Sequence, residues 1–126
     1  MKKLLLTLML ITASSNVMAE WVEIESNETD TFYADPATIR KTGNIVRMWV
    51  LTDYKTVQTN ASKPYMSKLG VRKYDCKEKQ SRATIKTLHS KNMGVGKYVG
   101  IIGNRPWLPV SPRTTSELLW KFACGR

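Results

Sequence analysis

Histidine and cysteine, from which many catalytic and metal sites are built, are scarce in this sequence. It has one histidine, His89, and two cysteines, Cys76 and Cys124, among 126 residues. Nucleophilic catalysis needs a base beside a serine or cysteine, and a zinc site needs closely spaced ligands. No serine lies in a Gly-x-Ser-x-Gly context. We therefore expect a structural role for His89, no catalytic, cofactor-binding or metal-binding residues, and no enzymatic activity.

Long apolar segments are also scarce. The longest run, Leu4–Ile11, is much shorter than the roughly 20 residues that a membrane-spanning helix needs. It follows two lysines and precedes the triplet Val17-Met18-Ala19, which completes the three-part pattern of a signal peptide. We expect residues 1–19 to be a signal peptide that is cleaved between Ala19 and Glu20. No transmembrane segment is predicted.

The part that remains after cleavage, residues 20–126, has the length of one domain and contains no repeat, linker or low-complexity tract. No cysteine lies near the cleavage point, so we expect no lipid anchor there. The sequence therefore predicts one exported domain that works in the periplasm or at the cell exterior.

Export determines how the two cysteines are interpreted. In an oxidising compartment, Cys76 and Cys124 most simply form one disulfide. The closed loop of about 49 residues would contribute at most about 4 kcal/mol in a chain-entropy treatment. Two free thiols are the alternative, and a metal site is less consistent with the ligand spacing.

Acidic residues are nearly absent after the first part of the exported domain. Residues 20–35 contain six acids and no base, whereas the rest of the domain contains four acids and eighteen bases. Asp53 and Asp75 are expected to pair with nearby lysines or arginines. Nine bases between positions 63 and 91 form the candidate surface for an anionic partner: Lys63, Lys68, Arg72, Lys73, Lys77, Lys79, Arg82, Lys86 and Lys91. An ordinary solvated basic face is an equally good interpretation of these charges.

Most of the exported domain has the pattern of β-strands. Apolar and polar residues alternate over 21–25, and residues 45–54 are apolar on both faces, which predicts a central strand. Residues 71–79 and 82–90 indicate a hairpin, and 95–102 a further strand. Residues 55–70, which lack a clear period, predict a surface loop.

The C-terminal residues predict a helix. Thr114 and Glu117 match a capping box, and an apolar side follows in Leu118, Leu119, Phe122 and Ala123. We expect Gly125 to end the helix in a left-handed conformation. The predicted fold class is α+β: an antiparallel sheet of five to six strands, with one C-terminal helix packed on it and one disulfide.

Two patterns that suggest nucleotide or nucleic-acid binding are weaker than they look. The glycines of Gly94–Gly100 lack the Ser or Thr of a phosphate loop and are better explained as turn and strand glycines. Aromatic residues interleaved with bases resemble a stacking platform, but an exported β domain needs aromatics for its core. We expect no nucleic-acid partner.

The order of several short motifs resembles the surface-adhesin protein E-like domain of Gram-negative bacteria. The resemblance runs from Trp21 to Cys124 and implies an antiparallel sheet, a C-terminal helix and one disulfide, in agreement with the patterns above. It also implies adhesin-like binding of host matrix or plasma proteins. The motifs are Trp21, Phe32–Ile39, Val46–Tyr54, Tyr74-Asp75-Cys76, Gly94-Val95-Gly96, Trp107–Pro112 and Cys124.

Two functional hypotheses follow. The first is a non-enzymatic binding protein that attaches to matrix proteins, anionic glycans or other anionic partners through its basic surface. The second is a periplasmic inhibitor or accessory factor of an envelope enzyme such as lysozyme, which would use residues 55–70 as its contact loop. A homodimer is an assembly that the sequence allows in either case.

The signal peptide yields the first testable prediction. When the whole gene is expressed in a Gram-negative host, the exported protein should begin at Glu20, because the small residues before that position suit a signal peptidase. N-terminal sequencing and intact mass measure the cleavage point. Replacing Ala19→Arg should leave the precursor uncleaved, and a wild-type protein that retains residues 1–19 would contradict the prediction.

Overall fold

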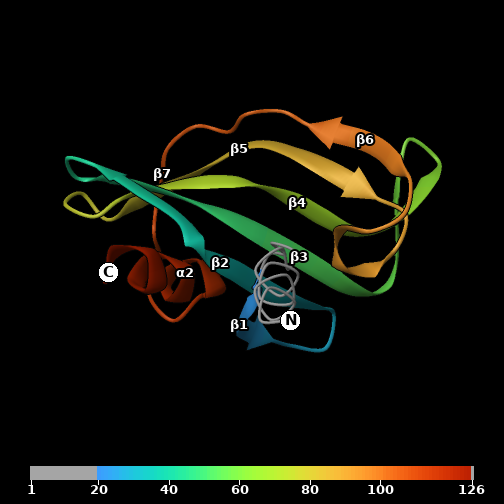
Figure 1. Cartoon of the computed structure of the whole chain (residues 1–126), viewed down its shortest axis with the longest axis horizontal. Coiled ribbons are helices and arrows are strands. Elements are labelled where there is room, and N and C mark those ends of the chain that lie inside the picture. Colours follow the sequence, from blue (N-terminus) through green and yellow to red (C-terminus); the bar gives the residue numbers. More distant parts are fainter. Residues whose placement is uncertain (1–19, 126) are drawn as a thin grey trace, which may run out of the picture.

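The computed structural model describes residues 20–125 as a β-sheet with one helix (Figure 1). The predicted signal peptide, and with it Ala19, lies outside the described residues. The elements follow the chain in the order β1 (Val22–Ser26), β2 (Asp30–Thr42), β3 (Ile45–Asn60), β4 (Lys63–Asp75), β5 (Gln80–His89), the 3-10 turn η1 (Asn92–Gly94), β6 (Tyr98–Ile102), β7 (Leu108–Pro109) and α2 (Thr115–Cys124).

The sheet is an antiparallel meander in which each strand pairs with its neighbours in the sequence. Its order is β1-β2-β3-β4-β5-β6, and the short β7 pairs with the other end of β5. The helix α2 lies against one side of this sheet, near β1 and β2 (Figure 1). The predicted α+β fold and the internal position of β3 are therefore confirmed.

The core on the helix side forms because successive side chains of β3 point to opposite faces of the sheet. Val46, Met48 and Val50 point to this side, and all three are buried. They pack with Leu119 and Ala123 of α2, which are also buried, and with Ala34 and Tyr74 from the neighbouring strands. The helix is too short to be stable alone, so this packing is what holds it in place.

The opposite face of β3 has a smaller apolar cover. Leu51 is fully buried and lies opposite Leu69 of β4. Gly94 of η1 comes so close that a Cβ atom at this position would lie 3.7 Å from a methyl group of each leucine. Asp53 fixes η1 there, because its Oδ1 accepts hydrogen bonds from Asn92 Nδ2 at 2.9 Å and Met93 N at 2.8 Å. The prediction that Asp53 pairs with a lysine or arginine was wrong.

Residues 55–70 are not a loop, contrary to the prediction. They form the ends of β3 and β4, which are joined by a two-residue turn at Ala61 and Ser62. Both turn residues have positive φ, 51° and 68°, as the tight turns that suit a hairpin require. The usual Asn-Gly marker is missing there, and an irregularity between Asp53 and Gln58 interrupts the alternation. Both features hid the strands from the sequence pattern.

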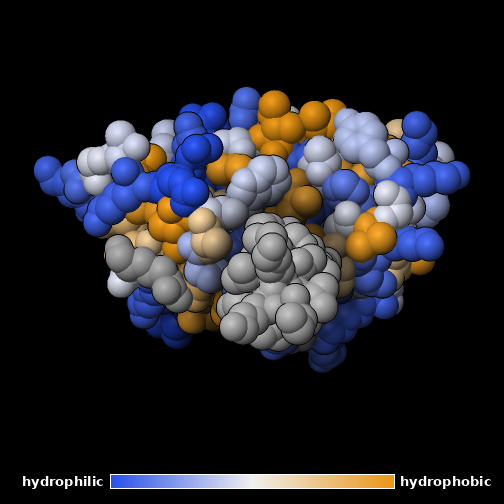
Figure 2. All heavy atoms as spheres, in the orientation of Figure 1, coloured by the Kyte–Doolittle hydropathy of each residue, from blue (hydrophilic) through white to orange (hydrophobic). Residues whose placement is uncertain are grey.

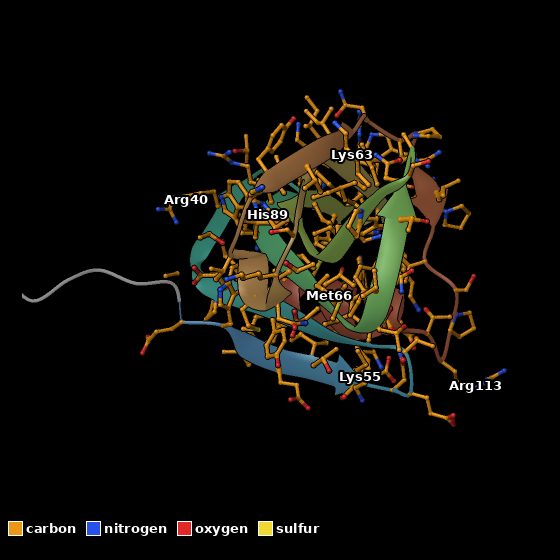
Figure 3. The ribbon with its side chains drawn as sticks, turned by 90° about the vertical axis from the view of Figure 1, so that its right-hand side faces the viewer. Arg40, Lys55, Lys63, Met66, His89 and Arg113 are labelled. Carbon is orange, nitrogen blue, oxygen red and sulfur yellow. A yellow bond between two sulfur atoms is a disulfide. The ribbon has the colours of Figure 1, made fainter. Side chains whose placement is uncertain are left out.

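Irregular register bends the sheet strongly. Each of the five principal strand pairs has a shift in register, for example between Asp35 and Arg40 in β2 and between Gly70 and Arg72 in β4. Such bulges kink a strand and increase its twist. The end-on view shows the strands wrapping around the side chains of the helix side (Figure 3). One face is therefore concave, and the other faces outward.

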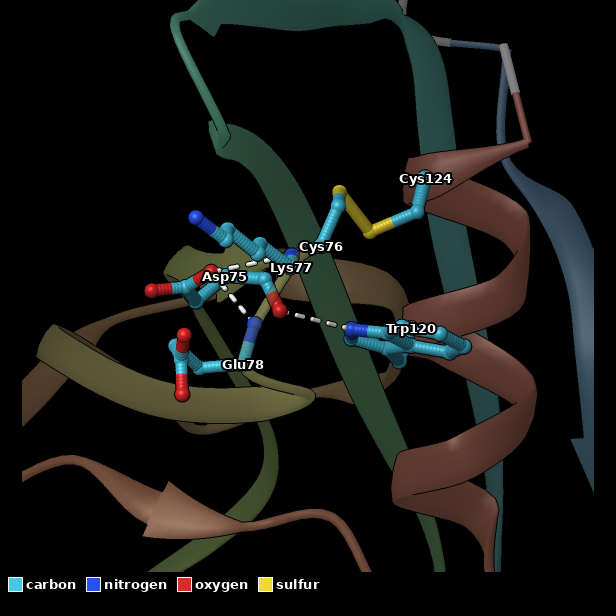
Figure 4. Close-up of a disulfide and its surroundings, with 6 residues drawn as sticks. All are labelled: Asp75, Cys76, Lys77, Glu78, Trp120 and Cys124. Atoms are coloured by element: carbon cyan, nitrogen blue, oxygen red, sulfur yellow. Dashed lines mark hydrogen bonds between the residues drawn. A yellow bond between two sulfur atoms is a disulfide. The ribbon is translucent and has the colours of Figure 1, made fainter.

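The disulfide joins α2 to the end of β4, as predicted (Figure 4). The Cα atoms of Cys76 and Cys124 are 5.6 Å apart. Beside the bridge, Trp120 Nε1 donates a hydrogen bond of 3.0 Å to the Asp75 carbonyl oxygen. The Asp75 carboxylate accepts from the backbone N–H groups of Lys77 and Glu78. Asp75 thus caps the β4–β5 turn, and the prediction that it pairs with a base was wrong.

The helix begins as predicted and ends differently. Thr114 Oγ1 accepts a hydrogen bond of 3.2 Å from Glu117 N, and Glu117 Oε1 accepts one of 3.1 Å from Arg113 N. At the other end, Gly125 has a φ of −79°, so the left-handed ending was wrong. Its N–H donates to the Lys121 carbonyl oxygen at 2.9 Å and continues the helical pattern.

Removal of the disulfide should destabilise the domain. The double variant Cys76→Ala, Cys124→Ala loses a constraint on a long loop of the unfolded chain, and we expect a loss of up to about 4 kcal/mol. Urea denaturation followed by circular dichroism measures the change. Trp120→Phe keeps the bridge but removes the bond to Asp75, and it should cost about 1 kcal/mol. Equal stability of the double variant and the wild type would contradict the prediction.

Candidate functional site

The sheet separates the nine predicted basic residues instead of gathering them on one surface. Lys73 and Arg82 are on the outward face, whereas Lys68, Arg72 and Lys86 line a hollow on the helix side. The other four lie at or beyond the strand ends: Lys63, Lys77, Lys79 and Lys91. Hydrophilic side chains gather at the end of the molecule that carries the β2–β3 and β4–β5 turns (Figure 2). One continuous basic surface from position 63 to 91 therefore does not form.

A row of four cations crosses the outward face. Arg40 lies opposite Arg47, Arg47 opposite Lys73, and Lys73 opposite Arg82. We call these four residues the outer row. Adjacent strands are about 4.8 Å apart, so the row extends over roughly 14 Å. Like charges in directly opposite positions destabilise a sheet, so this arrangement carries an energetic cost.

The acids nearest to the outer row form hydrogen bonds with the backbone and no ion pair with the row. Asp35 and Asp75 lie on this face on either side of the row, but their Oδ1 atoms accept backbone hydrogen bonds. Among residues 20–125, one ion pair has its nitrogen and oxygen within 4 Å. It joins Lys79 to Glu117 at 2.8 Å and does not involve the outer row.

The cations of the outer row are held in different ways. Arg40 lies on the outside of the curved sheet (Figure 3), and its Nη1 donates to the carbonyl oxygens of Ala37 and Ile39. Arg82 lies over the ring of Trp107, with its Cζ 5.9 Å from the ring centre.

The helix side contains a small hollow beyond the part of the sheet that α2 covers. We call it the helix-side pocket, and its volume is about 150 Å³. Four strands and the helix contribute to its lining, which combines apolar and basic side chains. The lining residues are Phe32, Val50, Thr52, Lys68, Gly70, Arg72, Lys86 and Leu119.

The charged forms of the two lysines in the helix-side pocket are disfavoured. Burial and, to a smaller extent, the positive charges of Lys68, Arg72 and Arg105 together lower the pKa of Lys86 to about 8. Burial also lowers the pKa of Lys68, although Tyr65 and Asp30 favour its charged form. Charged lysines in this position therefore lack the compensation that a nearby anion would supply.

Comparisons with known proteins agree with this fold. The family model of surface-adhesin protein E matches residues 21–125. This chain belongs to the surface-adhesin protein E family. No curated protein matches its sequence closely enough to be informative.

Solved structures of Haemophilus influenzae protein E are similar to the domain. One has a TM-score of 0.68 at 14% sequence identity, and the match covers 87% of each chain. A second crystal form has a TM-score of 0.69 at 14% identity and covers 87% of this chain and 91% of the other. Protein E from a non-typeable strain has a TM-score of 0.60 at 14% identity, with 88% and 79% covered. At this identity the likeness supports the fold.

In this member of the protein E family, sequence reasoning missed three basic residues of interest. Arg40 and Arg47 belong to the outer row, and Arg105 approaches Lys86 from the segment between β6 and β7. The first two flank a tight turn at Gly43, so pairing the strands around it would have placed them opposite one another. Arg105 has no such local marker, because its position depends on a hydrogen bond of 2.9 Å from its N–H to the Ala83 carbonyl oxygen.

The other residues that the sequence analysis considered, His89 and the glycines near position 94, have structural roles. His89 Nε2 and Thr87 Oγ1 are 2.8 Å apart in a hydrogen bond, and burial lowers the pKa of His89. Gly94 and Gly96 have positive φ, and a Cβ at Gly96 would lie 2.4 Å from Ser90 Oγ, which confirms the turn interpretation of these two. Within residues 20–125, no group of three acids, histidines or cysteines is placed to hold a metal, and no helix is long and apolar enough to cross a membrane.

The low pKa of Lys86 yields a prediction on stability. Its folded-state pKa of about 8 lies below the ordinary value of 10.5, so the charged form is disfavoured in the folded protein. This cost is full below pH 8 and disappears as the pH rises to 10.5. Lys86→Met should therefore raise the free energy of unfolding at pH 7 by on the order of 1 kcal/mol after allowance for solvent screening, and the melting temperature should rise with it.

The advantage of the variant over wild type should shrink between pH 8 and pH 10.5. Melting curves at several pH values measure it. Lys97→Met, which removes an exposed lysine outside both the pocket and the outer row, serves as the control for net charge. A Lys86→Met variant that is less stable than wild type at pH 7 would contradict the account of the pocket.

Proposed function

We propose that this domain is an exported, non-enzymatic binding protein with an adhesin-like role, and that it attaches to an anionic macromolecule through the outer row. The single observation that carries the proposal is the alignment of Arg40, Arg47, Lys73 and Arg82 across four strands. Membership of a surface-adhesin family supports attachment as the kind of task. The partner class that fits is a sulfated glycan or an acidic segment of a matrix protein.

Charge repulsion within the outer row is the physical basis of the proposal. Each of the four cations faces another cation on the next strand, and in the described residues none has an acid within ion-pair distance. A linear polyanion laid across the strands would place negative groups along roughly 14 Å of the sheet and relieve this repulsion. Such attraction acts over several ångströms and weakens with salt.

An aromatic side chain lies beside the outer row. Trp49 is the second residue after Arg47 on the same face of β3, and 40% of its surface is exposed. Large exposed aromatic rings contribute contact area at binding surfaces, and they can pack against the apolar face of a sugar. This neighbour favours a glycan over a purely electrostatic contact with any anion.

The role as an inhibitor of an envelope enzyme has less support. It depended on a mobile contact loop at residues 55–70, and these residues form a hydrogen-bonded hairpin. Export to the periplasm or the cell exterior remains part of the proposal, together with the absence of a lipid anchor.

Charge reversal tests the outer row. The triple variant Arg47→Glu, Lys73→Glu, Arg82→Glu should lose binding to immobilised heparin and to a heparin-binding matrix protein at low salt, with a fall of at least about a hundredfold in affinity. Surface plasmon resonance at 50 to 300 mM salt measures both the affinity and its salt dependence. Wild-type binding should weaken steadily as salt increases.

A matched control carries the same change in net charge at the other end of the sheet. Lys63→Glu, Lys91→Glu and Lys97→Glu alter three exposed lysines away from the outer row. This control should bind within about threefold of wild type, since rim charges have small effects. If both triple variants lose binding equally, net charge and not the outer row is responsible. A lytic assay with added lysozyme checks the inhibitor role in parallel.

A further inference from the structure

The helix-side pocket is a second basic region, with other cations than the outer row. It lies on the opposite face of the sheet, and its cations are Lys68 and Arg72 from β4 and Lys86 from β5. Arg72 and Lys86 also line an adjoining hollow of about 350 Å³, to which Arg105, Leu108 and Arg82 of the outer row contribute. These two cations therefore lie where the two hollows meet. A group bound between them would border both hollows.

The protein balances the positive charge of the pocket only in part. Four cations converge there if Arg105 is included. The charges of Arg72 and Arg105 lower the pKa values of both lysines, Lys68 and Lys86. Asp30 is the acid on this face nearest by register, because it precedes Phe32 by two residues on β2. It favours the charged form of Lys68, but it forms no ion pair within 4 Å in the described part of the chain. A net positive charge remains in a half-buried place.

Hydrogen-bond donors in the pocket also lack acceptors. Arg72 Nε is fully buried and has no hydrogen-bond partner. The Arg72 guanidinium also contacts the Tyr74 hydroxyl and makes a long contact of 3.4 Å from Nη2 to Ser81 Oγ. Buried donors without a partner are rare in native proteins and cost free energy, so the Arg72 guanidinium retains unused hydrogen-bonding capacity beside the pocket.

The backbone is shaped to keep this place open. Gly70 lines the pocket at a shift in register between β4 and β5. A Cβ atom there would lie 2.7 Å from the Ile85 carbonyl oxygen and 2.9 Å from Lys86 Cγ. Only glycine therefore allows β5 to approach so closely and carry Lys86 over the pocket. The opposite wall is apolar, made of Phe32, Val50 and Leu119.

We propose that the helix-side pocket binds the phosphate group of a small phosphate monoester, with the phosphate at Lys68, Arg72 and Lys86 and the apolar part of the ester against Phe32 and Leu119. A phosphate dianion neutralises more of the charge than a carboxylate does, and its oxygens accept bonds from arginine in a fork geometry. The volume of about 150 Å³ is smaller than that of most ligand pockets and is enough for one small ring, so the ligand must be small. Free phosphate shares this chemistry and should bind more weakly.

Phenyl phosphate and inorganic phosphate are the probes. Each is titrated into the purified exported protein at pH 7.5, and two-dimensional NMR follows the backbone amides of β4 and β5. Phenyl phosphate should bind saturably below about 10 mM, within the affinity expected for a ligand of this size. Inorganic phosphate should bind more weakly, and phenol, which lacks the charge, should not bind. Absence of saturable binding of phenyl phosphate would overturn the proposal.

Three lysine variants localise the binding. Lys86→Met and Lys68→Met each remove one cation from the pocket and should weaken phenyl phosphate at least about tenfold. Lys97→Met removes one exposed cation that belongs to neither the pocket nor the outer row, and it should leave the affinity unchanged. Melting curves confirm that each variant is folded, and either pocket variant suffices if the other does not fold. Equal weakening by all three variants would mean that only net charge matters and would overturn the site, without bearing on heparin binding by the outer row.

Discussion

The packing of α2 on the centre of the sheet is the interaction on which the rest of the structure depends. Leu119 and Ala123 complete the core that β3 presents through Val46, Met48 and Val50. The helix has ten residues and cannot be stable by itself, so the sheet must hold it, and the bridge between Cys76 and Cys124 makes the attachment covalent. Side chains alternate between the two faces of the sheet. Because the helix covers one face, each side chain points either to the covered face or to the open face.

Both proposed sites follow from this division. The outer row lies on the face that α2 leaves open, where four cations in register remain accessible. The helix-side pocket exists because α2 covers only part of the other face, and Leu119 forms one wall of the uncovered part. The same helix therefore leaves one basic surface fully open and encloses the other. In the proposals made above, the first surface serves attachment and the second holds a small ligand.

Several elements could be predicted because their cause is local. The two-faced apolar pattern of residues 45–54 predicted an internal strand, and β3 lies between β2 and β4. The capping residues Thr114 and Glu117 predicted the start of α2, because a helix cap involves residues only a few positions apart. Predictions failed where a turn lacked its usual residues, as at Ala61 and Ser62, or where an acid found a backbone partner, as at Asp53 and Asp75.

The sequence by itself determined the fold class, the disulfide, the order of most strands and the excess of positive charge. Each depends on composition or on patterns that span a few residues. Only the tertiary structure decided which cations act together. Arg40 and Lys73 are separated by 33 positions, yet only one strand lies between them in the sheet, whereas Arg72 and Lys73 are neighbours in the chain and lie on opposite faces. Strand register sets these relations, and register depends on turns and bulges that combine distant segments, so a stretch of basic residues in the sequence became two separate sites.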